Sequence, residues 1–69
     1  MINTEFIATD ELVMGGVPCL RGHRISVNQL LVEMANDGLS ATAEDYDLIE
    51  DHLKGMLADV CALINKESA

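Results

Sequence analysis

The sequence predicts a mainly α-helical fold, a small three-helix, helix-turn-helix-like domain with an N-terminal β ribbon. Glycine and proline punctuate the first part of the chain, which favours turns between short extended segments. Apolar residues then recur at helical spacing. With 69 residues the chain is expected to form one domain, the ribbon over residues 1–25 and the helices over residues 26–66.

The expected ribbon begins in residues 5–9, where β-branched and aromatic side chains favour a strand. Gly15-Gly16 suits a turn or bulge, because glycine tolerates positive φ. Pro18 biases the preceding residue towards an extended shape. Gly22 permits a sharp turn, which predicts a hairpin near Arg21–His23. Two strands alone are barely stable in water, so the ribbon needs a helix or a second copy beside it.

The first helix is expected to begin at Ser26. Ser26 and Gln29 have the spacing of a capping box, in which each side chain satisfies an orphan backbone donor. Gly38 suits the position that ends the helix. One apolar stripe follows the cap, formed by Val27, Leu30, Leu31, Met34 and Ala35.

Two further helices are expected. Ser40 or Thr42 could cap a short one over roughly Ala41–Tyr46, and Asp47 with Glu50 resembles the start of a long one. Gly55 interrupts the long helix at a cost of about 1 kcal/mol relative to alanine, and marks either a close helix contact or a tolerated residue. The long stripe comprises Leu48, Ile49, Leu53, Met56, Leu57, Val60 and Ile64.

Composition indicates an acidic binding module. The net charge is −8, with only four lysines and arginines against twelve carboxylates. Phosphate backbones require lysine and arginine, so general nucleic-acid binding is disfavoured. The imbalance would steer the chain towards a basic protein, although solubility alone would also explain it. A domain this small has a marginal core, which favours a dimer.

Cys19 and Cys61 are far apart and have no metal-ligand spacing. We expect both to be reduced core residues in the cytoplasm, because no signal peptide or membrane-spanning run is recognisable.

No residue pattern indicates catalysis, a metal or a cofactor. His23 and His52 have no paired ligand spacing and are interpreted as surface or boundary residues. Ser26 and Ser40 are interpreted as caps rather than nucleophiles. The acidic cluster lacks the glycine and ligand alternation of a Ca²⁺ loop, so it is either a solvated face or a docking face. Its members are Glu44, Asp45, Asp47, Glu50 and Asp51.

The only basic cluster crowds the predicted hairpin turn and consists of Arg21, His23 and Arg24. Either these side chains are exposed, with one arginine paired to a carboxylate, or they contact an acidic or phosphate group or a second subunit. Arginine on a constrained turn suits bidentate recognition.

The run from Gly16 to Val27, GVPCLRGHRISV, resembles the signature GKPCIRGTRIPV of the domain-of-unknown-function 433 family. The resemblance covers about Ile7 to Leu57. It is also carried by Asp10, Val13, Leu30-Leu31, Ala35, Gly38-Leu39-Ser40, Asp45-Tyr46 and the stretch from Leu48 to Leu57.

This resemblance implies a winged or homeodomain-like helix-turn-helix, usually homodimeric, related to VapB-type antitoxins that pair with a PIN-like nuclease toxin. The chain would then neutralise a basic toxin and bind operator DNA. Glu50 and Asp51 join the basic cluster as the expected partner-binding residues. The expected dimer interface consists of Val17, Cys19, Leu20 and Ile25.

The chain departs from the family pattern at Glu11, Val17, His23 and Ser26, and it is shorter between Ser40 and Leu48. The helix that would read DNA carries three acids against Lys54, which disfavours DNA binding. Three hypotheses therefore remain: an antitoxin-like protein-binding module, a helix-turn-helix DNA-binding regulator, and an acidic phage-type inhibitor that mimics nucleic-acid charge. An enzyme is not expected.

Overall fold

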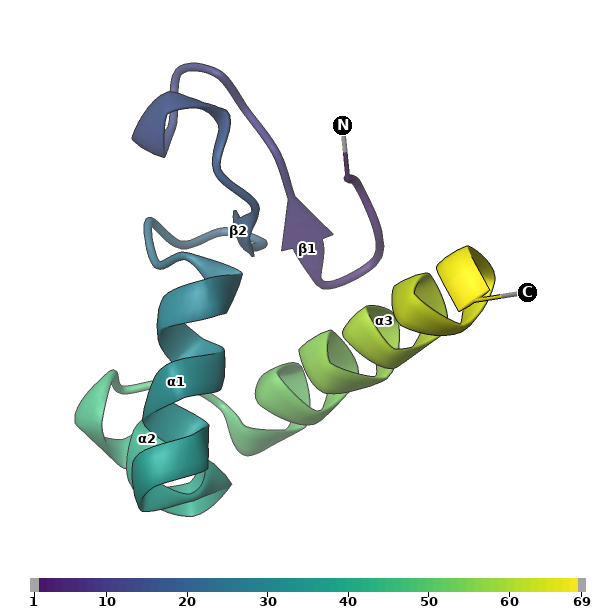
Figure 1. Cartoon of the computed structure of the whole chain (residues 1–69). Helices are drawn as coiled ribbons and strands as arrows, with labels where there is room; N and C mark the ends of the chain where they lie inside the picture. The colour runs from purple at the N-terminus through teal and green to yellow at the C-terminus, as the bar shows by residue number, and fades with distance from the viewer. Residues whose placement is uncertain (1, 69) are drawn as a thin grey trace.

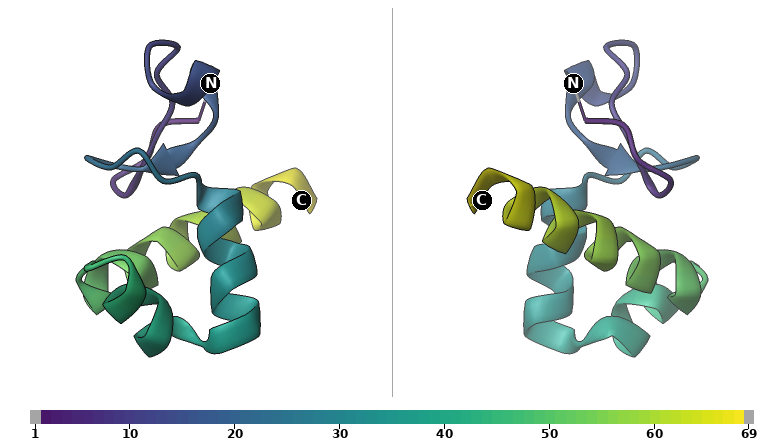
Figure 2. Two further views of the ribbon diagram at one scale, coloured as in Figure 1. Left: turned by 90° about the vertical axis from the view of Figure 1, so that its left-hand side faces the viewer. Right: turned by 90° about the vertical axis from the view of Figure 1, so that its right-hand side faces the viewer.

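The computed structural model describes residues 2–68, and it confirms a mainly helical chain with a short N-terminal β element (Figure 1). The ribbon lies at one end of the helical part (Figure 2). The elements in chain order are β1 (Ile7–Ala8), the 3-10 turn η1 (Met14–Gly16), β2 (Cys19–Leu20), α1 (Val27–Asp37), α2 (Leu39–Asp45) and α3 (Glu50–Ser68).

The ribbon contains the expected hairpin and one additional pairing. β1 and β2 are antiparallel, with Ile7 opposite Leu20. The hairpin returns from β2, since the Leu20 amide donates to the Ile25 carbonyl at 3.0 Å. The His23 amide closes the turn by donating to the Leu20 carbonyl, also at 3.0 Å. Gly22 has a φ of 85° at the third turn position, where a type II turn requires positive φ.

α1 begins as the capping pattern predicts. The Ser26 hydroxyl accepts a hydrogen bond from the Gln29 amide at 3.0 Å. The Gln29 side chain has a different partner, because its Nε2 donates to the Tyr46 hydroxyl at 2.8 Å and so ties α1 to the end of α2. Gly38 has a φ of 89°, ends α1 and is also the N-cap of α2, so no loop separates the two helices.

The boundaries predicted for the second helix were wrong at its start. α2 begins two residues earlier than expected and has no side-chain cap. Ser40 instead donates to Glu50 Oε1 at 2.7 Å. Thr42 is buried, and its hydroxyl donates back to the Gly38 carbonyl at 2.8 Å. Gly38 starts the helix through its backbone conformation, which composition alone does not reveal.

Asp47 was expected to start the third helix, but it belongs to the end of α2. Its amide donates to the Glu44 carbonyl at 3.2 Å, and the Leu48 amide donates to the Ala43 carbonyl at 2.7 Å. This pair of bonds is a Schellman motif, which places a left-handed residue at the C′ position. Asp47 occupies that position with a φ of 55°.

The core lies where the ribbon meets all three helices. α1 and α2 contribute Val27, Leu30 and Ala43. The ribbon contributes Ile7 and Leu20, and α3 contributes Leu53 and Met56. Two residues of the predicted α3 stripe, Ile49 and Ile64, are exposed, whereas Leu48 packs against the core.

Gly55 is required by a close contact between α3 and the segment before β1. A Cβ atom at this position would overlap the Phe6 ring. That ring also lies near His52, with centroids 6.0 Å apart and planes tilted by 45°. Of the two interpretations of Gly55, the close contact is therefore confirmed, although the neighbour is an aromatic ring rather than a helix.

We expect the Gly55→Ala substitution to destabilise the protein by about 1–3 kcal/mol through overpacking against Phe6. In a Phe6→Ala background the same substitution should instead stabilise by up to about 1 kcal/mol, since alanine is the better helix former. Urea unfolding followed by circular dichroism measures both effects. The same sign in both backgrounds would contradict the contact.

We expect Asp47→Gly to stabilise the protein by about 0.5–1 kcal/mol, because glycine occupies a left-handed position without the penalty of a Cβ atom. The control is Ala58→Gly, which places glycine at an exposed position inside α3 and should destabilise by about 1 kcal/mol. Thermal unfolding of the two variants should therefore shift in opposite directions.

Candidate functional site

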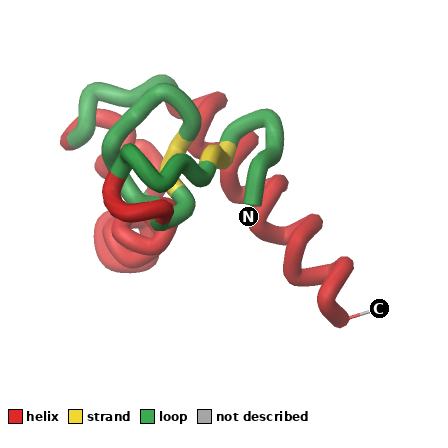
Figure 3. Tube along the Cα trace, turned by 90° about the horizontal axis from the view of Figure 1, so that it is seen from above, coloured by secondary structure: helices red, strands yellow, loops and turns green. Residues whose placement is uncertain are grey.

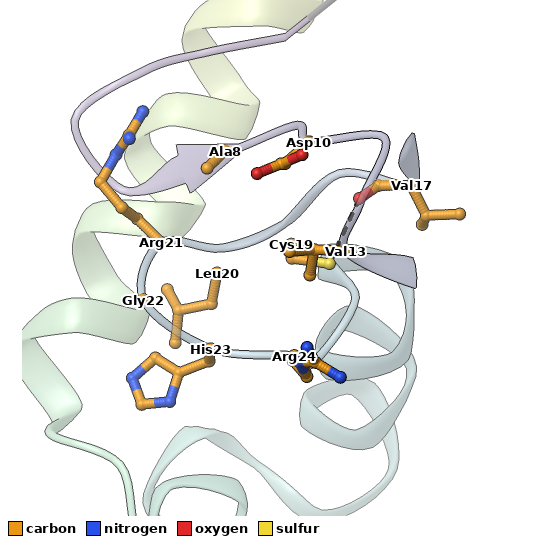
Figure 4. A pocket seen from close by; sticks show the side chains of 10 residues that line it. All are labelled: Ala8, Asp10, Val13, Val17, Cys19, Leu20, Arg21, Gly22, His23 and Arg24. Carbon is orange, nitrogen blue, oxygen red and sulfur yellow. Dashed lines mark hydrogen bonds between the residues drawn. The ribbon is translucent and has the colours of Figure 1, made fainter. Parts of the chain in front are cut away.

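The predicted basic cluster lies on a pocket beside the hairpin turn (Figure 4). This hairpin pocket has a volume of about 320 Å³. Its floor includes the buried Cys19, whose thiol donates to the Val17 carbonyl at 3.2 Å. The pocket is lined by Ala8, Asp10, Val13, Val17, Cys19, Leu20, Arg21, Gly22, His23 and Arg24.

Arg21 is held by the backbone of its own chain. Its guanidinium is directed towards the segment before β1 (Figure 4). Nε and Nη2 donate to the Thr4 carbonyl at 3.1 and 2.7 Å, and Nη2 also donates to the Ile7 carbonyl at 3.1 Å. Arg21 therefore closes the turn that precedes β1, and these donors are already engaged before any partner arrives.

His23 and Arg24 are exposed on the hairpin. Asp10, on the opposite side of the hairpin pocket, accepts a hydrogen bond from the Leu12 amide at 2.9 Å. All three side chains of the basic cluster are thus exposed, and that of Arg21 also bonds the backbone of the segment before β1.

The predicted acidic partner-binding residues come together with their neighbours at the α2–α3 turn. We call the group Glu44, Asp45, Asp47, Glu50 and Asp51 the acidic corner, and every member is exposed. Glu50 and Asp51 occupy the first turn of α3, where the helix dipole favours negative charge. The acidic corner lies at the opposite end of the helical part from the ribbon (Figure 1).

Of the four residues expected at a dimer interface, three are buried or partly buried within the single chain and one is exposed. Cys19 and Leu20 are only 3% and 1% exposed, so their side chains serve the core of a single chain. Ile25 is partly buried against that core. Val17 remains 42% exposed and is available to a partner.

Val17 lies on an apolar groove that the sequence did not reveal. The groove has a volume of about 310 Å³ and lies between the ribbon, α1 and the C-terminal half of α3. It is lined by Ile2, Ile7, Val17, Pro18, Val27, Asn28, Leu31, Val60, Leu63 and Ile64.

Asp59 is a second residue whose role the sequence did not reveal. Its Oδ2 accepts hydrogen bonds from the Thr4 hydroxyl at 2.6 Å and from the Phe6 amide at 3.0 Å. The available signal was its spacing, because Asp59 lies four residues after Gly55 and therefore on the same face of α3.

The two cysteines differ in environment. Both are free thiols, but Cys61 is exposed, so the expectation of a core position holds for Cys19 alone. Among residues 2–68 no group of three or more potential ligands could hold a metal ion. No helix in that range is both long and apolar enough to cross a membrane.

Together, these features define the class as a small three-helix domain with an N-terminal β ribbon, carrying an acidic corner and a separate apolar groove. The chain belongs to the family described as protein of unknown function (DUF433), which matches residues 7–58. The matched range confirms the family resemblance of the hairpin sequence. No curated protein and no solved structure matches the chain.

The engaged guanidinium of Arg21 leads to a stability prediction. We expect Arg21→Lys to lower the free energy of unfolding by about 1–2 kcal/mol, because an ammonium group cannot reproduce the fork that spans two carbonyls. Arg24→Lys, at an equally exposed position on the same hairpin, should change it by less than about 0.5 kcal/mol. Equal effects in urea unfolding would contradict a structural role specific to Arg21.

Proposed function

We propose that the chain is a protein-binding module that dimerises and neutralises a basic partner in the cytoplasm, in the manner of an antitoxin acting on a PIN-like nuclease. The observation that carries this proposal is the acidic corner, where five carboxylates are exposed within eight residues of sequence. Complementary charge of this kind accelerates encounter and selects among partners. The module acts by binding rather than by catalysis.

The distribution of charge also supports a negatively charged partner-binding surface on this chain. Arg21 already donates to its own backbone, which leaves Arg24, Lys54 and Lys66 as the other lysine and arginine side chains, and all three are exposed. These three are spread over the hairpin and both halves of α3, whereas five of the twelve carboxylates gather at one turn. A basic protein surface is therefore the counterpart that this distribution favours.

Operator binding is the weaker alternative. A helix-turn-helix protein would place the start of its recognition helix against DNA. Glu50 and Asp51 are exposed in the first turn of α3 and would be repelled by the phosphate backbone. We propose that any operator contact depends on the exposed hairpin arginines, Arg21 and Arg24, and a gel-shift titration of the chain's own promoter at low salt would detect it.

Co-purification tests the main proposal. Tagged protein should retain the product of the adjacent gene, and raising the salt concentration should weaken that complex, because charge complementarity supports it. Failure to bind that product, with unchanged toxicity when the chain is deleted, would reject the antitoxin role.

Charge reversal identifies the surface that binds. We expect the double variant Glu50→Lys and Asp51→Lys to weaken the complex at least about tenfold, since each change places a cation against a basic partner. The matched control is Glu5→Lys with Glu11→Lys, which changes the net charge equally on exposed ribbon positions. Titration calorimetry should show little change for the control. Equal weakening by both variants would assign the effect to net charge rather than to the acidic corner.

A further inference from the structure

The apolar groove combines a concave surface with exposed apolar side chains. Ile2, Val17 and Ile64 line it and are three of the large hydrophobic residues that the chain leaves exposed. Ile64, in the C-terminal half of α3, is the most exposed of the three, at 59%. Contiguous exposed apolar surface of this kind is typical of an interaction site.

Among the side chains that the structure describes, no ionisable one lines the groove, which is unusual in a chain with a net charge of −8. Its lining consists of aliphatic residues, Pro18 and the neutral amide Asn28. The sequence from Val60 to Lys66 likewise contains no carboxylate. Two copies of so acidic a chain repel each other at most approaches, so a groove lined by uncharged side chains is where like copies can meet at a low electrostatic cost.

The C-terminal turns of α3 extend past the other elements (Figure 3). Cys61, Ala62 and Ile64 are exposed there, while Val60 and Leu63 are only partly buried. Isolated helical turns are marginal in water and draw most of their stability from tertiary packing. This half of α3 therefore presents an apolar strip for which a single chain provides incomplete cover.

We propose that the groove binds the C-terminal half of α3 from a second copy, forming a two-fold symmetric dimer. Each copy supplies both a groove and a projecting helix, which is the self-complementarity that an isologous interface requires. Ile64 of each copy enters the groove of the other, beside Val17 and Leu31. This proposal deepens the dimerisation part of the proposed function and moves the interface from the buried ribbon strands to the groove.

Sedimentation velocity of the purified chain, without any partner, tests the proposal. The wild-type protein should sediment as a dimer and dissociate on dilution. Ile64→Glu should raise the dissociation constant at least about a hundredfold, because the two-fold interface contains the substitution twice and each buried charge costs about tenfold or more.

The matched control is Ile49→Glu. Ile49 is 61% exposed, is also an isoleucine and lies just before α3, but it does not line the groove. This variant should dimerise like the wild type, and circular dichroism should show native helix content in both variants. A wild-type monomer at high concentration, or equal dissociation constants for the two variants, would overturn the proposal.

The partner experiment separates this proposal from the proposed function. A dimer that binds no basic partner would reject the antitoxin role and leave the groove interface intact. Conversely, a monomer that binds its partner in a manner abolished by Ile64→Glu would assign the groove to that partner and reject the second copy.

Discussion

The contact between Phe6 and Gly55 is the constraint on which the rest of the structure depends. The ribbon has only two-residue strands, and such a small sheet has little stability of its own. Phe6 attaches the segment before β1 to α3, where the absence of a side chain at Gly55 lets the ring approach the helix backbone. Ile7 then follows directly into the core beside Leu53 and Met56.

Two polar groups fix the same segment. Asp59 accepts hydrogen bonds from Thr4 and Phe6, and Arg21 donates to the carbonyls of Thr4 and Ile7. A carboxylate from α3 and a guanidinium from the ribbon therefore satisfy the backbone of one tight turn, and charge-assisted bonds of this kind are stronger than neutral ones. The family sequence around Arg21 is thus explained in part by folding rather than by recognition.

Charge and apolarity are separated on the surface. The acidic corner occupies the α2–α3 turn, and the groove involves the opposite half of α3 together with the ribbon. A basic partner and a second copy would accordingly use different surfaces of the chain and would not compete for the same residues. This separation is consistent with a module that both dimerises and binds a partner, because each surface suits a different kind of interaction.

The sequence by itself determined the local features. Ser26 and Gly38 are the residues at which α1 begins and ends, as predicted, and Gly22 forms the predicted turn. These features depend on the capping and φ preferences of a few neighbouring residues, which can be predicted directly from the sequence. The family was also recognisable from the hairpin sequence, whose glycine, proline and arginine spacing is local.

Only the tertiary structure decided which side chains the fold itself uses. Arg21 and Cys19 had the chemistry of surface or interface residues, but the first bonds a segment 17 residues away and the second is buried. Ile64 follows the same helical pattern as Met56, yet one is exposed and the other is in the core. Periodicity predicts which face of a helix is apolar. It does not predict how far along the helix neighbouring elements cover that face, because this depends on contacts between residues distant in the sequence.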